Sequence, residues 1–498
     1  MMSSELGSTA PEDATPVADS MVERAPVSPN VPDLLRVSPM ETSTATDIET
    51  SILDPAVSSD SFCRFVFLNK GILHSHSKVT FAVNGDNAKR FFPLGVGVAS
   101  LIQRAALKIG TKTIQEIDGY NYLTAYKSLF VSNEHQLERE QVQSGRVIAH
   151  EFRYSDLTTN VGGPDCNTQA DTYGLSNGRE YNGVVGADKE LGIQDWADLE
   201  NKPVFQIALS DLFPMLKQTQ LPLYMMKEQV SVELTFEPVA RHRICNGRAV
   251  VTGTAAQVID TTQLKLIADY IYYPQEMMDA YAAQNSTVSI THFDYRHSKL
   301  SISATSTSGT TQIRNLGGAG RIVTKVITGV QADSANDDSI LNQFHAISPQ
   351  STYAFGEAPA AGKQNGSLTV NVKYNDRFLY PIDVTNPARQ FHNTAQAEGM
   401  VPFVTREEYS SEGVALTSSD FEKYQQNLGD AGDEKGVQGR FNWLAYRLNR
   451  NERINSRGIE YFWKYEGLST AGSYTQRTWL ELAKATTISG GYASTVFI

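Results

Sequence analysis

The sequence predicts an all-β protein that folds as two or more antiparallel β-sandwiches or barrels. The chain has 498 residues, and a single hydrophobic core stops growing at roughly 250–300 residues, so more than one domain is expected. Short runs with the alternation of a β-strand recur along most of the chain, separated by Gly, Asn, Pro and Ser. Helical patterns are few and short. Many short strands with turn residues between them are typical of antiparallel sandwiches and barrels.

Strand-like alternation begins abruptly at Ser61. Apolar residues occur at both parities of Phe62–Leu68, so this strand is expected to be covered on both faces. The next run, Ile72–Val83, ends at the turn pair Asn84-Gly85. Further strand-like runs follow in this order: Ala105–Ile117, Pro203–Leu209, Gln229–Phe236, Gln257–Tyr273, Thr287–Ala304, Arg321–Val330, Ser367–Tyr374, Ile459–Tyr465 and Thr486–Ile498.

Two segments carry helical signals. Tyr120–Phe130 has apolar residues at helical spacing, and Pro274–Gln284 begins with a proline and an acidic first turn, as helix N-termini prefer. The second segment lies near the middle of the chain, so we interpret it as a connector between two β-rich halves. Two long polar stretches, Glu134–Pro203 and Val401–Arg440, predict loops that are functional or interfacial.

The first 60 residues differ from the rest of the chain. They contain no Phe, Trp or Tyr and seven of the 19 prolines. Such a segment cannot bury enough apolar surface to offset its conformational entropy. We therefore expect residues 1–60 to form an arm that is disordered in the free subunit or ordered on assembly, with Val31–Val37 and Ile48–Ile52 as short apolar clusters for docking.

Charge and composition exclude several classes of protein. The net charge is −12; residues 1–60 contribute −9, which leaves 41 basic and 44 acidic residues in the other 438. A nearly neutral body without a basic block disfavours direct binding of nucleic acid. No apolar run approaches the roughly 18 residues of a membrane span, and the first 60 residues predict no secretory signal. Three widely spaced cysteines favour a reducing compartment over a disulfide framework.

Few short motifs suggest chemistry. His74 and His76 would share one face of a strand, but no acidic or Cys residue stands nearby to complete a metal site. Gly95–Ser100 lacks the third glycine and the parallel βαβ context of a dinucleotide-binding turn. Gly317–Gly320 lacks the Lys and Ser/Thr of a phosphate loop, so it predicts a turn before the strand at Arg321.

Isolated nucleophiles and carboxylates are equally uninformative. Cys166 lies in a turn-rich loop and Cys245 follows His242 by three residues, but neither has the signature of a catalytic cysteine. Glu233 and Glu237 fall on one face of a strand, which favours a solvated face over an acid/base pair. The sequence therefore predicts no catalytic, cofactor-binding or metal-binding residues, no cofactor, and a protein that is not an enzyme.

Three stretches carry a resemblance to a known family. They are Phe91–Tyr120 with its Ile-Gly turn, Leu212–Phe236 with the motifs Leu-Phe-Pro and Leu-Pro-Leu, and Leu266–Met278 at the expected connector. Their order and spacing resemble those of the double jelly-roll major capsid proteins of double-stranded DNA viruses. The polinton-like viruses and virophages are most similar, and large algal and giant DNA viruses are related. The connector is Met- and Ala-rich here, where the more distant viruses have an Arg-rich one.

The resemblance implies two consecutive eight-stranded jelly-roll sandwiches with short helices and long loops. The first jelly roll would span residues 61–273, the connector helix 274–285 and the second jelly roll 286–498. The chain would then be a major capsid protein that forms homotrimeric, pseudo-hexagonal capsomers on the facets of an icosahedral virion. Its partners would be neighbouring capsomers and penton and minor capsid proteins, with no sequence-specific binding of nucleic acid.

Two other functions remain open from the residues. Jelly rolls also occur in lectins, so a receptor- or glycan-binding protein of the virion surface is an alternative. A cupin-type oxygenase would need a ligand-rich strand motif that is absent. Aromatic residues in loops and near strand ends suit interfaces between subunits; they are Tyr173, Tyr181, Trp196, Trp443, Trp463 and Trp479. For Trp463, which lies in a strand-like run, core packing is an equal alternative.

Overall fold

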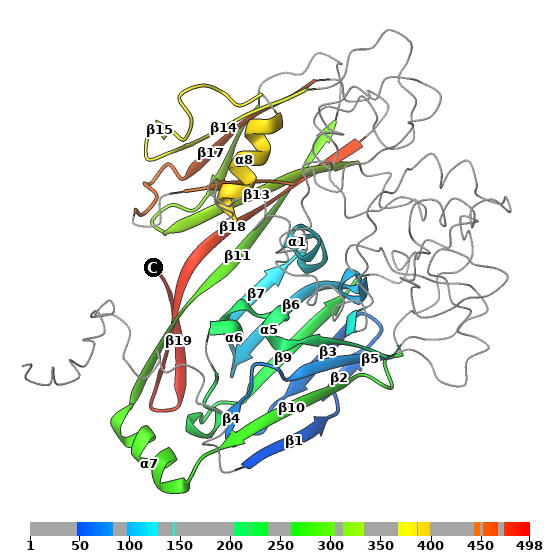
Figure 1. Cartoon of the computed structure of the whole chain (residues 1–498), viewed down its shortest axis with the longest axis vertical. Coiled ribbons are helices and arrows are strands. Elements are labelled where there is room, and N and C mark those ends of the chain that lie inside the picture. The colour runs from blue at the N-terminus through cyan, green and yellow to red at the C-terminus, as the bar shows by residue number, and fades with distance from the viewer. Residues whose placement is uncertain are drawn as a thin grey trace, which may run out of the picture.

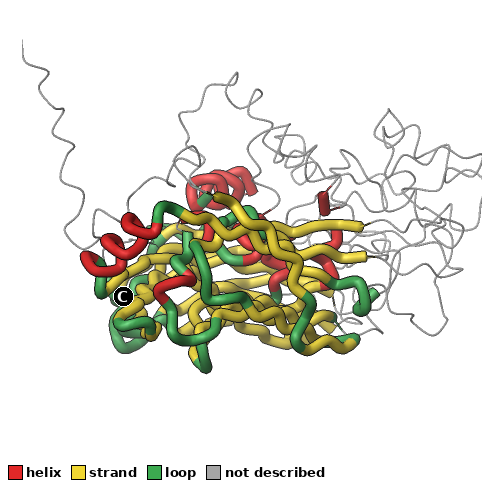
Figure 2. The backbone as a smooth tube through the Cα atoms, turned by 90° about the horizontal axis from the view of Figure 1, so that it is seen from below, coloured by secondary structure: helices red, strands yellow, loops and turns green. Residues whose placement is uncertain are grey.

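The computed structural model describes twelve parts of the chain. They are residues 47–82, 97–127, 143–144, 204–218, 220–237, 260–303, 312–332, 367–385, 387–398, 443–448, 452–466 and 473–498. Strands make up most of these parts and the helices are short (Figure 2). The strands form four antiparallel sheets, two in each half of the chain (Figure 1). The predicted all-β fold class is therefore confirmed.

The first sandwich consists of sheets A and B. Sheet A has the order β1 (Asp47–Leu53), β10 (Lys265–Tyr272), β5 (Lys78–Ala82), β8 (Val204–Ala208), with β4 (Ile72–Leu73) also paired to β10. Sheet B has the order β2 (Val57–Ser59), β3 (Phe62–Val66), β9 (Val230–Phe236), β6 (Ile102–Ile109), β7 (Lys112–Asp118). The two sheets face each other across a core in which the rings of Phe81 and Phe236 meet edge to face, with centroids 6.4 Å apart.

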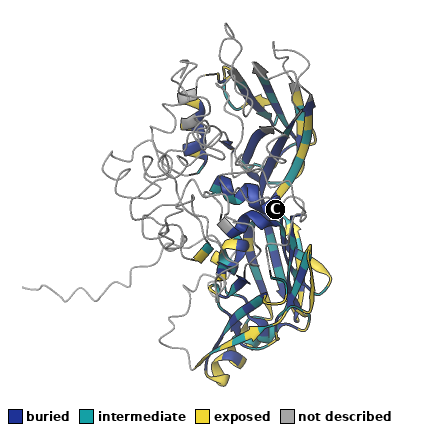
Figure 3. Ribbon diagram, turned by 90° about the vertical axis from the view of Figure 1, so that its right-hand side faces the viewer, coloured by how far each residue is buried: buried dark blue, intermediate teal, exposed yellow. Residues whose placement is uncertain are grey.

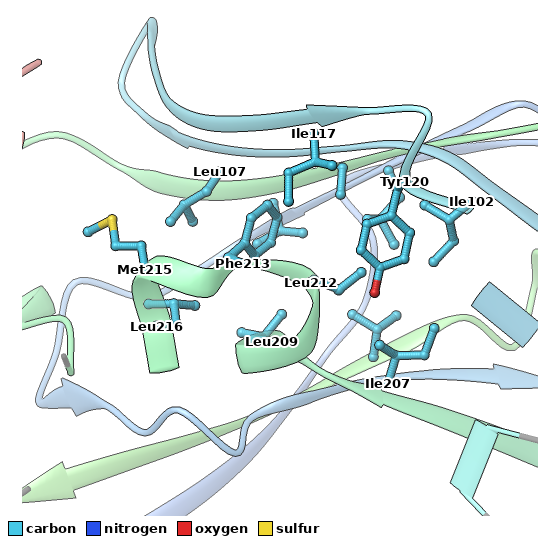
Figure 4. Close-up of a cluster of buried hydrophobic side chains, with 14 of the residues drawn as sticks. Ile102, Leu107, Ile117, Tyr120, Ile207, Leu209, Leu212, Phe213, Met215 and Leu216 are labelled. Atoms are coloured by element: carbon cyan, nitrogen blue, oxygen red, sulfur yellow. The ribbon is translucent and has the colours of Figure 1, made fainter. Parts of the chain in front are cut away.

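Two short helices close the core of the first sandwich. They are α5 (Leu209–Leu212) and α6 (Pro214–Gln218), and the Leu-Phe-Pro motif lies where one ends and the other begins. Leu212, Phe213 and Met215 are fully buried there, in one cluster with Leu107 of sheet B and Tyr120 of helix α1 (Tyr120–Lys127) (Figure 4). Proline suits this place because its fixed φ is compatible with the first turn of a helix. The motif thus supplies core residues.

The second sandwich consists of sheets C and D. Sheet C has the order β11 (Thr287–Ser303), β18 (Ser473–Ser489), β13 (Val323–Ala332), β16 (Leu444–Arg447), and β19 (Tyr492–Phe497) also pairs with β18. Sheet D has the order β12 (Gln312–Gly317), β17 (Ile459–Glu466), β14 (Ser367–Tyr374), β15 (Arg377–Phe378). Val326 and Leu480 of sheet C pack against Val372 and Tyr461 of sheet D.

The described residues hold more than eight strands in each half. In the first sandwich the excess comes from β1 and β2, which residues 47–59 add to the free edges of sheets A and B. This end of the segment predicted as an arm is therefore part of the body. In the second half the two-residue strand β15 adds one further strand.

The remaining helices lie between or beside the sandwiches. Helix α7 (Gln275–Gln284) follows Pro274 and occupies the position predicted for the connector. Two 3₁₀ turns, η3 (Gly97–Leu101) and η7 (Leu223–Met225), belong to the first sandwich. Helix α8 (Pro387–Ala397) packs along β16, whose Ala445 amide donates a hydrogen bond to Thr394. None of the helices in the described parts is long and apolar enough to cross a membrane.

Candidate functional site: the seam between the two sandwiches

The two sandwiches are joined along a long strand pair. β11 and β18 are each 17 residues long and are paired over their whole length. One part of this ladder belongs to the second sandwich, and the rest continues beside the first sandwich (Figure 1). On one side of the contact between the sandwiches lie this ladder and the strands next to it. On the other side lie β7, α1 and α6 of the first sandwich. We call this contact the seam.

Sheet C is buried on both of its faces. On one face, Leu480 and Val326 pack against sheet D. On the other face, Trp479 and Ile327 belong to the same apolar cluster as the core of the first sandwich. This follows from the period of two along a strand, which sends successive side chains to opposite faces. Buried residues therefore continue from one sandwich into the other (Figure 3).

At the seam, edge strands of two different sheets meet. The side chain of Gln115 on β7 donates a hydrogen bond to the Phe293 carbonyl on β11 (2.5 Å) and accepts one from the Met215 amide (3.2 Å). In return, the carboxylate of Asp294 accepts a hydrogen bond from the Glu116 amide (3.3 Å). Side chains thus satisfy backbone groups that an open edge would expose, and an open edge invites pairing with other chains.

Buried charged groups join β7, β11 and the C-terminal strands at the seam. Lys484 and Asp294 form an ion pair of 2.9 Å, and their side chains are 7% and 10% exposed. The ammonium group of Lys112 donates a hydrogen bond to the Ala493 carbonyl on β19 (2.6 Å). Each contact links a pair of residues more than 180 positions apart, so together they lock the C-terminal strands to the first sandwich and to β11.

A histidine stacks on a tryptophan in the middle of the seam. Nδ1 of His297 lies 2.8 Å from Oδ2 of Asp118, and the imidazole is parallel to the Trp479 ring at 4.6 Å. The indole N–H of Trp479 donates to the Asp118 carbonyl (3.0 Å). Gly119 has φ of +66°, and a Cβ atom there would lie about 3.0 Å from the His297 ring. Only glycine fits this close approach easily.

A second polar cluster joins helices α1 and α8 to sheet C. Glu481 on β18 accepts hydrogen bonds from the hydroxyl groups of Tyr295 (2.8 Å) and Thr324 (2.5 Å). Lys325 lies between Glu481 and Glu398, 3.8 and 2.7 Å from their carboxylates. Burial acts to raise the pKa of Glu481, but Lys325 and the two hydroxyl groups outweigh it, so this pKa is lowered. The carboxylate is therefore ionised and fully engaged.

Cations of this cluster also lie over aromatic rings. The ammonium of Lys127 is 4.2 Å from the centre of the Tyr295 ring, and the guanidinium of Arg477 is 3.8 Å from that of Tyr122. Burial lowers the pKa of Lys127 to about 8. The polar groups of the seam face one another, so the arrangement is suited to holding two domains in one orientation.

The histidine pair and glycine motif suggested by the sequence do not form a site. His74 and His76 lie in the turn between β4 and β5, so their placement on a strand was wrong. The His76 amide donates to Nδ1 of His74 (3.0 Å), a local bond that favours a turn over a strand. Gly97–Leu101 is a 3₁₀ turn. No group of three or more potential metal ligands occurs among the described residues.

The cysteines and carboxylates can be placed only in part. Cys166 and Cys245 lie outside the described residues. Cys63 is buried, which raises the pKa of its thiol to about 12 and suppresses the reactive thiolate. Glu233 pairs with Lys108 (2.6 Å) on the outer face of sheet B. Glu237, predicted on a solvated face, is buried, and Asn121 donates a hydrogen bond to its Oε1 (2.9 Å).

The described tryptophans are interior residues. Trp443, Trp463 and Trp479 are each at most 2% exposed within a single chain. The prediction that they lie at an interface between subunits was therefore wrong for Trp443 and Trp479. For Trp463, the alternative of core packing is correct. Tyr173, Tyr181 and Trp196 lie outside the described residues, as do the predicted loops except for residues 143–144. Sequence reasoning did not identify the seam, because its polar residues alternate along strands as solvent-facing residues do.

Comparisons with known proteins identify the fold. Residues 78–274 match the model of the family described as major capsid protein N-terminus. A structure of the Sputnik virophage is similar over 99% of this chain and 93% of its own, with 10% identity and a TM-score of 0.51. The mavirus major capsid protein (98% and 97% covered, 10% identity, TM-score 0.49) and a PBCV-1 capsid protein (91% and 97%, 12%, 0.48) are also similar. No curated protein sequence matches significantly.

These findings confirm the resemblance to double jelly-roll major capsid proteins. The family match lies in the first sandwich, and the likeness to the Sputnik structure shows the fold of both.

Proposed function

We propose that this chain is a major capsid protein whose copies form homotrimeric, pseudo-hexagonal capsomers on the facets of an icosahedral virion of a double-stranded DNA virus. The proposal starts from the family match of the first sandwich and from the double jelly-roll fold. The observation that carries it is the seam, because it turns two sandwiches into one block. Three such blocks present six sandwiches, which is what a pseudo-hexagonal tile requires.

A shell subunit must keep its shape under load from its neighbours. Domains joined by a flexible linker move relative to one another by default. Here the 17-residue ladder of β11 and β18 continues from one sandwich to the other without a break in register. Bending the molecule at the seam would require breaking ladder hydrogen bonds or separating buried apolar surface. The subunit is therefore built as a rigid unit.

One exposed apolar patch lies on the outer face of sheet D. It consists of Ile313, Phe378 and Phe462, and we call it patch D. Ile313 is directly opposite Phe462 in the ladder, and the rings of Phe378 and Phe462 are 5.3 Å apart. Ile313 is 63% and Phe378 50% exposed. Contiguous apolar side chains on a surface mark interaction sites.

A second patch lies on the outer face of sheet A. It consists of Ile48, Ile52 and Ile267, and we call it patch A. Ile48 and Ile52 are 47% and 68% exposed, and Ile52 is directly opposite Ile267. On the same face, Thr50 donates a hydrogen bond to Asp269, and Lys265 pairs with Asp54. The exposed isoleucines beside these polar pairs are candidates for cover by a neighbour.

Symmetry makes two different patches useful. A closed ring of three identical subunits needs a heterologous contact, in which one surface of each copy meets a different surface of the next. Patches A and D lie on different sandwiches, so neither can cover the other within one chain. A second copy of the chain is the partner that supplies the complementary patch. We infer that the two patches take part in the contacts of the trimer.

The test is the mass of the full-length protein in solution. Mass photometry at micromolar concentration should show trimers, and a strictly monomeric protein would count against the proposal. Ile52→Glu and Phe378→Glu should each leave a folded subunit that does not close into trimers. Leu68→Glu makes the same change at an exposed residue (49%) outside both patches, so it should stay trimeric.

Mixing the two variants distinguishes the kind of contact. An Ile52→Glu subunit keeps an intact patch D, and a Phe378→Glu subunit keeps an intact patch A. A heterologous contact can therefore form once between them, so the mixture should contain dimers that neither variant forms alone. Monomers only, in a mixture whose wild-type parent is trimeric, would show that the patches do not meet.

The proposal also includes other capsid proteins as partners and a compartment in which the capsid assembles. Penton and minor capsid proteins are expected to contact the finished capsomer, and assembly is expected in a reducing compartment of the host cell. The arm would supply acidic charge to a basic partner, because residues 1–60 carry a net charge of −9.

A further inference from the structure

Two histidines are buried in the seam on one strand, five residues apart. His292 is 1% exposed, and the side chain of His297 is 2% exposed. Histidine is the side chain whose ordinary pKa, about 6.5, lies closest to physiological pH. A buried histidine at a contact between domains can therefore couple that contact to acidity.

His292 has no counter-ion of its own. Neither ring nitrogen has a hydrogen-bond partner in the described part of the chain, and the carbonyls of Ile290 and Ile114 lie near the ring without reaching hydrogen-bond geometry. The residue directly opposite on β18 is Lys484, a cation. The nearest carboxylate, Asp294, is already engaged by Lys484 at 2.9 Å and by a β7 amide. A proton on His292 would thus add a second buried cation beside the first.

The other charged groups around His292 also have partners of their own. On β7, the Lys112 ammonium binds the Ala493 carbonyl, and Glu116 pairs with Arg104 at 2.5 Å. On helix α6, Lys217 pairs with Asp211 at 3.2 Å. None of these described groups is placed to neutralise an imidazolium at His292. Burial lowers the pKa of His292 and outweighs the charge of Asp294, which raises it, while the charge of Lys484 lowers it further.

His297 differs because it has an acidic partner. Asp118 lies 2.8 Å from its Nδ1 and would stabilise the protonated ring, whereas Nε2 is buried without a partner. The charges of Arg477 and Lys299 oppose protonation. Burial outweighs Asp118, so the pKa of His297 is lowered as well. Protonation of His297 is therefore less disruptive than protonation of His292.

We propose that the seam is an acid-responsive contact, in which His292 is the sensor and His297 adds to its response. At neutral pH both rings are uncharged and the seam is closed. In acid, protonation of His292 places an unpaired cation next to Lys484, and the contact between β7 and β11 opens to solvate it. If the chain is the capsid subunit proposed above, its shell loosens in an acidic compartment.

The direction follows from linkage. A lowered pKa means that the closed seam binds protons less well than the open seam, in which the histidines titrate near 6.5. Closed contacts are therefore fully stable above about pH 6.5 and lose stability as the pH falls below it. Each histidine can shift the opening equilibrium by up to about tenfold per pH unit.

The experiment is amide hydrogen exchange on the full-length protein between pH 7.5 and 5.0, corrected for the intrinsic rate. Protection of β7 and β11 should fall at least tenfold in acid, while strands in the middle of the sandwiches keep theirs. His292→Gln should remove most of this loss. His76→Gln changes an exposed histidine in a turn and should respond as wild type does. Equal protection of the wild-type seam at both pH values would overturn the proposal.

A second variant covers the case in which His292→Gln does not fold. Lys484→Met removes the opposing cation and frees Asp294 to pair with a protonated His292. The opening should then shift to lower pH, and opening at the wild-type pH would contradict the proposal. The outcome is independent of the capsid function. A trimer whose seam does not open in acid would contradict only the proposal that His292 is a sensor. A monomer whose seam opens in acid would contradict only the proposal of a trimer.

Discussion

At the scale of single residues, Gly329 is the described glycine at which an added Cβ atom would come closest to a neighbour, the ring of Trp443. A Cβ atom on Gly329 of β13 would lie within 3.0 Å of three ring atoms of Trp443. Real Cβ atoms do not come so close to a ring. The backbone of β13 is therefore a flat surface on which the indole of Trp443 lies, and the absence of a side chain is what allows it.

This contact predicts the effect of one added methyl group. Gly329→Ala should lower the free energy of unfolding by about 1–3 kcal/mol, because overpacking forces the ring or the strand to move. Chemical denaturation measures the change. In a Trp443→Leu background the same substitution should cost clearly less, since residues in contact are coupled. An equal cost in both backgrounds would show that the ring is not the cause.

At the scale of elements, β1 shows how the chain protects an edge. All seven of its residues pair with β10. Tyr272 donates a hydrogen bond to Glu49 (3.1 Å), which also pairs with Lys70, and Thr50 donates one to Asp269 (2.7 Å). Without β1, the backbone groups along one side of β10 would be exposed and could pair with other chains.

Two truncations test this role of β1. Removal of residues 1–53 should destabilise the protein by on the order of 2–4 kcal/mol, from lost ladder hydrogen bonds and the burial of Leu53, and should promote aggregation. Removal of residues 1–46 keeps β1 and serves as the matched control, so its melting temperature should equal that of the full chain. Thermal unfolding and light scattering report both effects. If the two truncated proteins behave alike, β1 contributes nothing to the edge.

The elements also show how far the sequence could be read. β14 has the bounds that alternation predicts, and α7 lies at the predicted connector with a proline before its first turn. The run Ala105–Ile117 is instead two strands, because Gly110 takes φ of +59° and turns the chain back. Periodicity continues across that turn, so alternation alone did not reveal it.

Strand β18 was missed over most of its length for a different reason. Only Thr486–Ile498 shows clear strand alternation, whereas the part before it contains buried polar residues such as Gln476, Glu481 and Lys484. These residues are buried because partners from other elements satisfy them, as Thr324 does for Glu481. A single sequence shows that they are polar but not which residues meet them. The seam could therefore not be predicted, although both sandwiches could.

At the scale of the whole molecule, the two sandwiches share apolar surface. Residues of sheet C such as Trp479 and Ala445 belong to one cluster with the core of the first sandwich, while alternate residues of the same strands fill the second core. Neither sandwich can unfold without exposing one face of sheet C. Domains joined by a large apolar interface are expected to unfold together, in contrast to domains on a linker.

We therefore predict a single cooperative unfolding transition for both halves. Leu107 is buried in the first core and Leu480 in the second, and Leu→Ala at such positions costs about 2–5 kcal/mol. Of the described tryptophans, Trp463 is buried in the second core, whereas Trp443 and Trp479 lie at the seam, so their fluorescence reports on the second core and the seam. Leu107→Ala should nevertheless lower the midpoint seen by fluorescence as much as Leu480→Ala does.

Calorimetry should show one peak for each variant, because a loss of stability in either core is a loss for the whole block. Two peaks, of which Leu107→Ala moves only one, would mean that the seam does not couple the sandwiches, and a rigid tile would then need its neighbours in the shell to hold it in shape.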